Sequence, residues 1–326
     1  MNRLRNKYRA NPPTADEHRP RIEFWGPVRG QSGDDLLDLD FAPDEKQPRP
    51  EHCPICMHRA LLFVANVYGW PIYECRQCEG GFVWPQPSSE LLDRLYGPDF
   101  WSNYLGSEQP LYCRPESVHA SKRGFECLDR ILQHNHKLRI LDVGAGDGTM
   151  LRYLADAGYH NTLGIELDKQ NARRAQDKLG VPVVSVDFLT FQESGWDTIM
   201  LWATVEHLRD PVSFLGHARD LLAPGGLFIV MTGDNSSFHA WFEGAMDYWV
   251  YPPNHLFYFT VSSLRWLFRN ARFERFRWRL QFQPRWKESI LWAHRLFRSA
   301  RVRLSSKNRF WRSTQTNLLV AWGQKP

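Results

Sequence analysis

The segment RILDVGAGDGT at 139–149 constrains the fold more than any other part of the chain. An apolar run at Ile140, Leu141 and Val143 leads directly into three glycines at alternate positions. Glycine is needed where the backbone adopts a positive φ or lies against a ligand without a Cβ atom between them. The pattern therefore predicts a buried strand, a tight turn and the start of a helix whose free N–H groups can receive a polar ligand.

Strand-like and helix-like segments alternate from residue 138 onward. We expect parallel strands and intervening helices, with strands at 139–144, 162–167, 181–187, 196–202 and 227–232 and helices at 149–158, 168–180 and 211–226. This alternation predicts a doubly wound α/β sheet that binds ligands at the carboxyl ends of its strands. Two closing strands are expected at 272–280 and 317–324. The second of these should lie antiparallel beside the strand at 227–232.

Four motifs, in this order, resemble those of class I S-adenosylmethionine-dependent methyltransferases: GAGDG at 144–148, GIELD at 164–168, ATVEHLRDP at 203–211 and LLAPGG at 221–226. The resemblance covers about residues 136–326 and implies a Rossmann-like sheet of seven strands. A nicotinamide dehydrogenase is the competing interpretation, because it also combines a glycine-rich turn with a ribose-binding acid. The acid before the turn and the APGG segment before the fifth strand favour the methyltransferase.

The resemblance also implies roles for individual residues. The glycine turn would approach the methionine part of the donor, and Glu166 would hold the ribose hydroxyls. Asp187 would accept from the adenine amine, with Phe188 beside the ring. A carboxylate suits a diol because two O–H donors meet two acceptor oxygens. The residues implied to bind the donor are Asp142, Gly144, Ala145, Gly146, Glu166, Leu167, Asp187, Phe188, Ala203 and Glu206.

Two histidines are candidates for the chemical step. Methyl transfer to a hydroxyl requires an aligned nucleophile and a group that removes its proton, and imidazole titrates near neutrality. We assign His255, in PPNHLFYFT, as the base and His207, in ATVEHLRDP, as its orienting partner. For both histidines the alternative is a packing role or a role in the cofactor loop. The aromatic residues expected to line the acceptor pocket are Tyr96, Trp101, Tyr104, Tyr251 and Tyr258.

Four of the six cysteines form two CxxC pairs, Cys53 with Cys56 and Cys75 with Cys78, separated by 18 residues. This spacing is typical of a zinc ribbon, in which four thiolates hold one tetrahedral ion. A four-thiolate shell leaves no open coordination position, so we expect the zinc to be structural. The pattern also favours metal over disulfides and a cytoplasmic location.

The segment YECRQCEGGFVWPQPSSELLDRLY at 73–96, which follows CPIC, resembles the N-terminal zinc ribbon of a subgroup of bacterial methyltransferases. Members of that subgroup modify sugars, polysaccharides, lipid-linked intermediates and secondary metabolites. Sugar C-methyltransferases with this ribbon carry an HEH-type segment, whereas this chain reads NHLFYFT at 254–260. The resemblance therefore implies O-methylation of a small-molecule, glycan or lipid-linked acceptor, with sugar C-methylation as an alternative.

Composition divides the chain into four parts. Residues 1–50 are rich in proline and charge and are expected to be a disordered or extended arm. The zinc ribbon is expected at 51–87, a helical linker or substrate cap at 88–135, and the Rossmann-like domain at 136–326. Within this last part, a basic helical insertion is expected at 283–316.

Basic charge is concentrated at the end of the chain. Residues 261–326 carry sixteen Lys and Arg and two acids, although the net charge of the whole chain is +5. This asymmetry predicts an anionic neighbour, such as a membrane surface on the cytoplasmic side, RNA or a phosphorylated acceptor. A solvated surface helix is the alternative. An RNA methyltransferase and a catalytically silent binding protein are therefore further candidates, and the sequence does not indicate an oligomeric state.

Overall fold

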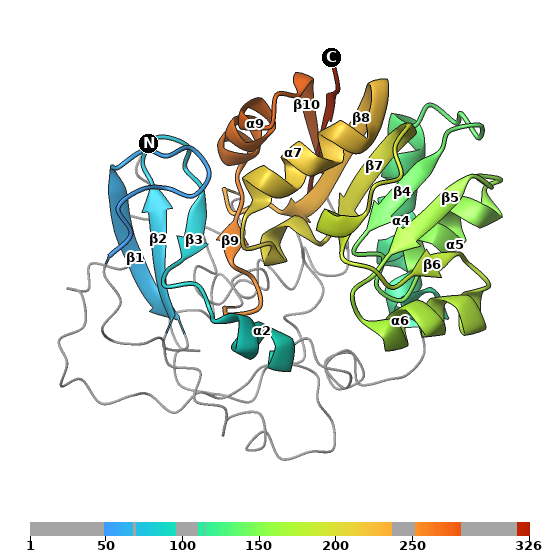
Figure 1. Ribbon diagram of the computed structural model, residues 1–326, viewed down its shortest axis with the longest axis horizontal. Coiled ribbons are helices and arrows are strands. Elements are labelled where there is room, and N and C mark those ends of the chain that lie inside the picture. Colours follow the sequence, from blue (N-terminus) through green and yellow to red (C-terminus); the bar gives the residue numbers. More distant parts are fainter. Residues whose placement is uncertain (1–48, 68–69, 96–109, 114, 237–251, 282–317) are drawn as a thin grey trace, which may run out of the picture.

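The computed structural model describes residues 49–67, 70–95, 110–113, 115–236, 252–281 and 318–326 (Figure 1). The basic insertion expected at 283–316 and nearly all of the arm at 1–50 lie outside these ranges. Four of the expected acceptor-lining residues also lie outside them: Tyr96, Trp101, Tyr104 and Tyr251. None of the helices in the described part of the chain is long and apolar enough to cross a membrane.

The larger sheet has seven strands in the order β10-β11-β8-β7-β4-β5-β6. Its parallel strands are β4 (Ile140–Val143), β5 (Thr162–Ile165), β6 (Val183–Val184), β7 (Trp196–Trp202) and β8 (Leu222–Gly233). Strand β11 (Leu318–Gln324) runs antiparallel between β8 and β10 (Glu274–Gln281), with Val320 opposite Met231. The doubly wound α/β fold is thus confirmed, including the antiparallel strand beside β8.

Helices cover both faces of this sheet, and each face has its own apolar core. Side chains of β8 alternate between the two: Phe228 packs with α7 (Pro211–Leu221) and α9 (Val261–Asn270). Ile229 packs on the other face, whose helices are α4 (Pro115–Ile131), α5 (Thr149–Asp156) and α6 (Lys169–Arg174), the last continued by the π-helical turn η2 (Ala175–Leu179). Because both faces are covered, every residue of the central strand β4 is buried, and three of its four residues are apolar.

Some element boundaries differ from the sequence-based expectation by several residues. The helix expected to reach residue 226 ends at Leu221, because Leu222 already pairs with Trp196 of β7. The glycines that follow therefore belong to the long strand β8, in which Gly225 has a φ of 77°. The strand expected at 181–187 is limited to Val183–Val184.

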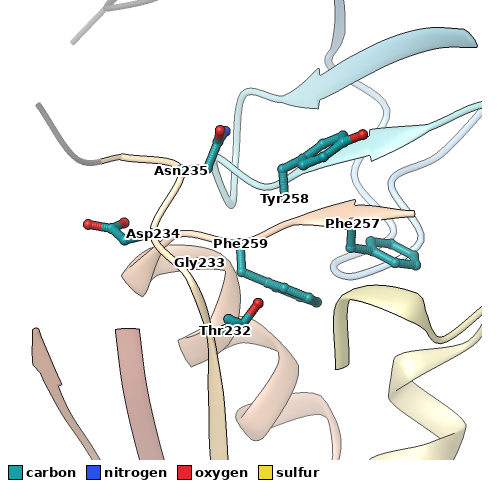
Figure 2. Close-up of a pocket in the computed structure, with 7 residues that line it drawn as sticks. All are labelled: Thr232, Gly233, Asp234, Asn235, Phe257, Tyr258 and Phe259. Carbon is teal, nitrogen blue, oxygen red and sulfur yellow. The ribbon is translucent and has the colours of Figure 1, made fainter. Parts of the chain in front are cut away.

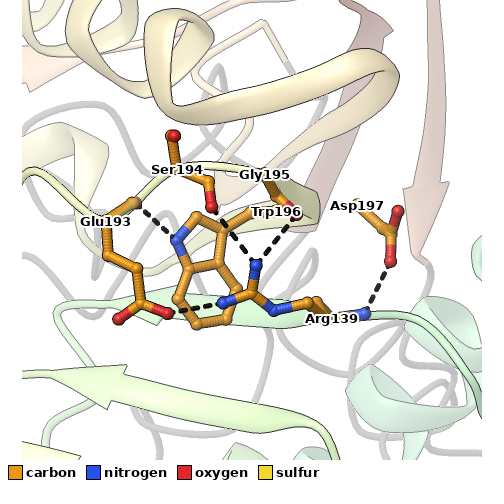
Figure 3. Close-up of polar contacts among 6 residues, drawn as sticks. All are labelled: Arg139, Glu193, Ser194, Gly195, Trp196 and Asp197. Atoms are coloured by element: carbon orange, nitrogen blue, oxygen red, sulfur yellow. Dashed lines mark hydrogen bonds and ion pairs between the residues drawn. The ribbon is translucent and has the colours of Figure 1, made fainter.

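Arg139 ties together the amino ends of the central strands β4 and β7 (Figure 3). Its backbone N–H donates to Oδ2 of Asp197 at 2.8 Å, and its guanidinium lies 4.4 Å from the ring centre of Trp196. The same guanidinium donates to the carbonyls of Ser194 and Gly195 at 3.2 Å each. These contacts fix one end of the strand pair, so the opposite, carboxyl end is held in a defined register.

The smaller sheet contains three strands of the cysteine-rich region, β1 (Leu61–Val67), β2 (Trp70–Cys75) and β3 (Gly81–Val83). Its fourth strand is β9 (Phe257–Tyr258), which comes from the far part of the chain and pairs antiparallel with β3. Figure 1 shows β9 standing between the two sheets. The side chain of Asn270, at the end of α9, also donates to the carbonyl of Ile55 at 2.6 Å. The ribbon is therefore docked on the larger domain, next to the loop that carries His255.

A few short elements complete the described chain. Helix α2 (Ser89–Leu95) follows the ribbon, and the 3₁₀ turn η1 (Leu111–Cys113) lies over the start of α5. The backbone N–H of Leu111 donates to Oδ2 of Asp147 at 2.6 Å, and that of Tyr112 donates to the hydroxyl of Thr149 at 3.0 Å. This segment therefore covers the amino end of α5 and one side of the glycine turn.

Candidate active site

The three glycines of the turn after β4 all have positive φ angles, but they serve different purposes. A Cβ atom at Gly144 would lie 2.5 Å from Oγ1 of Thr204, and one at Gly148 would lie 2.7 Å from Cβ of Ala175. These two glycines are required by packing. A Cβ atom at Gly146, where φ is 55°, would meet no atom within 4 Å. The turn therefore presents the backbone of Gly146 to open space, where a ligand can approach.

Two carboxylates lie beside this turn. Asp142 is 1% exposed, and its Oδ1 atom has no hydrogen-bond partner within the described part of the chain. Burial, together with the nearby charge of Glu166, raises the pKa of Asp142 to about 8. Buried polar atoms are normally paired, so this oxygen indicates a group that the described residues do not supply.

Glu166 follows β5 and is bound to the turn. Its Oε2 atom accepts from the backbone N–H of Gly146 at 2.7 Å, and its Oε1 atom accepts from that of Asp168 at 3.0 Å. Burial raises the pKa of Glu166, and these two backbone donors oppose the shift. Each carboxylate oxygen has a second lone pair, so Glu166 retains two acceptor positions, which match the hydroxyls of a diol.

The carboxyl ends of β5 and β6 present apolar side chains to solvent. Leu167 is 72% exposed and Leu189 is 51% exposed, both unusual for leucine. Asp187 caps the short 3₁₀ turn η3 (Phe188–Thr190) through a hydrogen bond of 2.9 Å from the backbone N–H of Leu189 to its Oδ1 atom. Leu167 follows β5, and Asp187 and Leu189 follow the neighbouring strand β6, so this edge of the sheet combines apolar and acidic groups suited to a heterocyclic base.

Phe188 is placed differently from the expectation that its ring lies beside adenine. The ring is 3% exposed and packs against Phe214 of α7, with the ring centres 4.6 Å apart. Phe188 therefore belongs to the core. The motifs of the sequence did not indicate the exposed Leu189. From the sequence, only a prediction of which residues after β6 are buried and which are exposed could have indicated that Leu189, rather than Phe188, faces outward.

A second cluster follows β7. The strand ends at Trp202, Ala203 adopts a left-handed backbone conformation with a φ of 55°, and the 3₁₀ turn η4 (Val205–His207) begins two residues later. Glu206, His207 and His255 each offer one ligand atom, and these three atoms lie within 4.8 Å of one another. The two imidazole rings are 4.7 Å apart at an angle of 74°. The structure thus brings together the two histidines proposed from the sequence.

Burial controls the charge of this cluster. Glu206 is 1% exposed, and burial raises its pKa to about 8, against the effect of its own backbone N–H and of the Thr232 hydroxyl. Burial lowers the pKa of His207 to about 4, and a hydrogen bond of 2.9 Å links its Nδ1 atom to the carbonyl oxygen of Asn254. A carbonyl only accepts, so Nδ1 carries the proton of the neutral imidazole and Nε2 carries the lone pair.

The loop that carries His255 is clasped by backbone contacts. The N–H of Leu256 donates to the carbonyl of Glu206 at 2.7 Å, and the hydroxyl of Tyr258 donates to the carbonyl of His255 at 3.1 Å. Tyr258 is 4% exposed and pairs with Gly81 of the ribbon. Its hydroxyl is therefore engaged in holding the loop, and its side chain also lines the small pocket at the end of β8, so its role in lining an acceptor pocket stays a prediction.

A small pocket lies where this loop meets the end of β8 (Figure 2). It is lined by Thr232, Gly233, Asp234, Asn235, Phe257, Tyr258 and Phe259. The backbone N–H of Asn235 donates to the carbonyl of Phe259 at 2.8 Å, which joins the two segments. The pocket therefore lies beside the loop that carries His255.

The cysteine cluster has the geometry of a tetrahedral metal site. The sulfurs of Cys53 and Cys78 are 3.6 Å apart and those of Cys56 and Cys75 are 3.4 Å apart. Tetrahedral ligands at zinc–sulfur distances of about 2.3 Å would be roughly 3.8 Å apart. The neighbouring sulfur of Cys75 and burial raise the pKa of Cys53. Four thiolates this close would repel one another, so the cluster suits a cation.

The two CxxC turns repeat each other closely. In each, a backbone N–H donates to the first cysteine sulfur at 3.4 Å, from Ile55 to Cys53 and from Gln77 to Cys75. In each, the residue after the second cysteine has a φ of 61°, at Met57 and at Glu79. Both turns are therefore preorganised in the same way around one position.

A family model described as a methyltransferase domain matches residues 119–275, which include both the donor-side and the acceptor-side clusters. Residues 119–275 therefore match a methyltransferase domain. The match begins in α4 and ends in β10, so it contains all five parallel strands of the larger sheet.

Curated relatives match the methyltransferase domain over a limited length. A ubiquinone biosynthesis O-methyltransferase of Paramagnetospirillum magneticum is 38% identical over 101 residues, which are 29% of this chain and 40% of the relative. The enzyme of the same name from Caulobacter sp. is 32% identical over 103 residues, again 29% and 40% of the two chains. The chain thus spans about two fifths of the length of these relatives.

Solved structures show the fold of the methyltransferase domain. The magnesium protoporphyrin IX methyltransferase of Synechocystis PCC 6803 with bound SAH is 11% identical, with a TM-score of 0.51 over 73% of this chain and 100% of that chain. The [4+2]-cyclase SpnF is 16% identical, with the same TM-score of 0.51 over 74% and 98%. Because a cyclase shares the fold, the reaction has to be argued from the site.

Proposed function

We propose that this chain is an S-adenosylmethionine-dependent O-methyltransferase that acts on a small-molecule acceptor. The observation that carries the proposal is the donor-side arrangement: Glu166 is bonded to the open Gly146 backbone, and the buried Asp142 nearby has an Oδ1 atom with no partner among the described residues. The curated relatives are named O-methyltransferases, which supports a hydroxyl acceptor. The resemblance of the ribbon extends the proposal to glycan-linked and lipid-linked hydroxyls.

The donor-side residues fit a sulfonium nucleoside. Glu166 has two acceptor positions for the ribose hydroxyls, and Asp187 and the exposed Leu167 edge the place for the base. Asp142 offers a cationic ligand a carboxylate oxygen that has no partner in the part of the chain that the structure describes. The donor supplies both the methyl group and its own leaving group, so the protein needs to align the reactants and to manage one proton.

On the acceptor side, imidazole nitrogens supply the lone pairs that can accept the proton of the acceptor hydroxyl. His255 is the proposed base, and His207, fixed by its hydrogen bond to Asn254, is the partner that orients it. As the hydroxyl oxygen forms its bond to the methyl carbon, the carbon–sulfur bond breaks and the hydroxyl proton passes to imidazole. Neither histidine needs to be charged beforehand, in agreement with the lowered pKa of His207.

The cysteine cluster is proposed to hold a structural zinc ion. Zinc accepts four thiolates in a tetrahedral shell with no position left for substrate. Its role is then to order the ribbon, whose strand β3 pairs with the loop that carries His255.

The test is transfer of labelled methyl from S-adenosylmethionine to hydroxylated acceptors and to metabolite extracts, with the products identified by mass spectrometry. We expect the labelled methyl group to be attached to oxygen, as a methyl ether. The Asp142→Asn variant should give no product. Transfer only to nitrogen or carbon would contradict O-methylation. Tight donor binding without transfer to any fraction would favour a silent binding protein.

A further inference from the structure

Glu206 has an unusual environment for a carboxylate. It is 1% exposed, and neither of its oxygens has a hydrogen bond of standard geometry from any residue that the structure describes. Carboxylates withdrawn from water are normally paired with a cation or bound to a metal. The side chain lies in the cluster with His207 and His255, so its oxygens face two imidazoles.

The imidazole of His207 is already oriented as a metal ligand would be. Metal-bound histidines generally donate their second ring N–H to a carbonyl or carboxylate, which fixes the tautomer and the ring plane. Here the Nδ1 atom of His207 bonds to the carbonyl of Asn254 at 2.9 Å, so Nδ1 carries the proton and Nε2 is the nitrogen with which His207 can coordinate a metal. The hydrogen bond from Leu256 to the carbonyl of Glu206 joins the two segments that supply the ligands.

We propose that Glu206, His207 and His255 bind one divalent transition-metal ion at the acceptor side of the site. Two imidazole nitrogens and one carboxylate oxygen suit zinc, iron(II), manganese(II) or cobalt(II) better than calcium or magnesium, which prefer oxygen ligands alone. The three ligand atoms lie within 4.8 Å of one another, and side-chain rotation toward the ion would bring them to the separation of about 3 Å that ligands of one ion have.

Three protein ligands leave coordination positions for the acceptor. This step rests on the proposed function, since it concerns the hydroxyl that receives the methyl group. A cation beside that hydroxyl favours loss of its proton to solvent, so the ion would replace His255 as the group that activates the oxygen. The favoured acceptor class then has two neighbouring oxygens that can chelate the ion, such as a catechol, a vicinal diol or a hydroxy acid.

The experiment is a titration of the full-length, zinc-loaded protein with cobalt(II), followed by absorption spectroscopy and metal analysis. Cobalt in the four-thiolate ribbon gives strong charge-transfer bands, whereas cobalt bound by nitrogen and oxygen gives weak bands only. We expect the wild-type protein to take up a second, exchangeable ion with weak bands. Glu206→Gln and His255→Gln should each weaken its uptake at least about tenfold, in line with the loss of a metal ligand or its support.

The matched control is His134→Gln, because the side chain of His134 is 65% exposed and pairs with Asp129 away from the cluster. It should take up cobalt as the wild type does. Circular dichroism and thermal unfolding show that each variant is folded. Equal cobalt uptake by Glu206→Gln and wild type, or no second ion in the wild type, would overturn the metal site.

The outcomes for the metal site and for the methyltransferase differ. Methyl transfer to a hydroxyl that persists in a chelator, with the ribbon zinc retained, would overturn the metal proposal and leave the O-methyltransferase intact. Uptake of the second ion without any binding of S-adenosylmethionine would support the metal site and overturn the proposed function.

Discussion

The backbone N–H of Gly146 donates a hydrogen bond of 2.7 Å to the Oε2 atom of Glu166. This bond links the glycine turn after β4 to the acid after β5, so the two motifs form one structural unit. It also means that the acid is positioned before any donor binds, and preorganised polar groups bind with less loss of entropy.

Glu166→Gln should weaken binding of S-adenosylmethionine about tenfold to a hundredfold, the range for losing one hydrogen bond to a charged group. The amide keeps the size of the side chain but replaces one acceptor oxygen with a donor, which opposes both the N–H of Gly146 and a ribose hydroxyl. Titration calorimetry measures the change. The control is Glu126→Gln on α4, where the side chain is exposed. If both variants bind S-adenosylmethionine with equal affinity, Glu166 does not contact the donor.

The buried Asp142 should make stability depend on pH. Burial, and then the charge of Glu166, raises its pKa from 3.8 to about 8 in the folded chain. Between these values the folded state holds a proton that the unfolded state has released, so the free energy of unfolding falls as pH rises, by up to about 1.4 kcal/mol per pH unit. Urea unfolding across this range should show a shallower fall for Asp142→Asn. Parallel curves for variant and wild type would contradict the raised pKa.

Much of the larger sheet could be predicted because its signals are local. The apolar run at 140–143 and the glycines after it specify a strand and a turn within a few residues, and the last apolar segment could only join the sheet beside β8. The spacing of the two CxxC pairs likewise brings four sulfurs together without knowledge of the rest of the fold.

Contacts between distant segments could not be predicted in this way. Strand β9 has only two residues, Phe257 and Tyr258, which is too short for an alternating pattern to reveal a strand or its partner β3. His207 and Asn254 are 47 positions apart, so their hydrogen bond depends on how the loop after β8 returns over η4. The orientation of Phe188 into the core follows from its packing against α7, which the sequence around it does not show.

Loss of zinc should disturb the acceptor side through the ribbon. Cys75→Ser removes one of four thiolates, and β3 loses the support that holds Gly81 and Phe82 against β9. We expect faster hydrogen exchange at Phe257 and Tyr258, measured by mass spectrometry, while the glycine turn is protected as in wild type. Cys113→Ser is the matched control because Cys113 is exposed and outside the cluster. Unchanged exchange at β9 in the zinc-free variant would show that the loop does not depend on the ribbon.

Alanine variants at two glycines can distinguish the cost of backbone strain from the loss of a ligand contact. Gly146 and Gly180 have similar φ angles, 55° and 65°, and a Cβ atom at either would meet nothing within 4 Å. Alanine in this left-handed region costs about 1–2 kcal/mol, so Gly146→Ala and Gly180→Ala should lower the free energy of unfolding by similar amounts in urea titrations. Only Gly146→Ala places a methyl group where the donor would lie against the turn, so only this variant should lose affinity for S-adenosylmethionine. If both variants bind the donor equally well, the open space at Gly146 is not the place where the donor sits, whatever their stabilities.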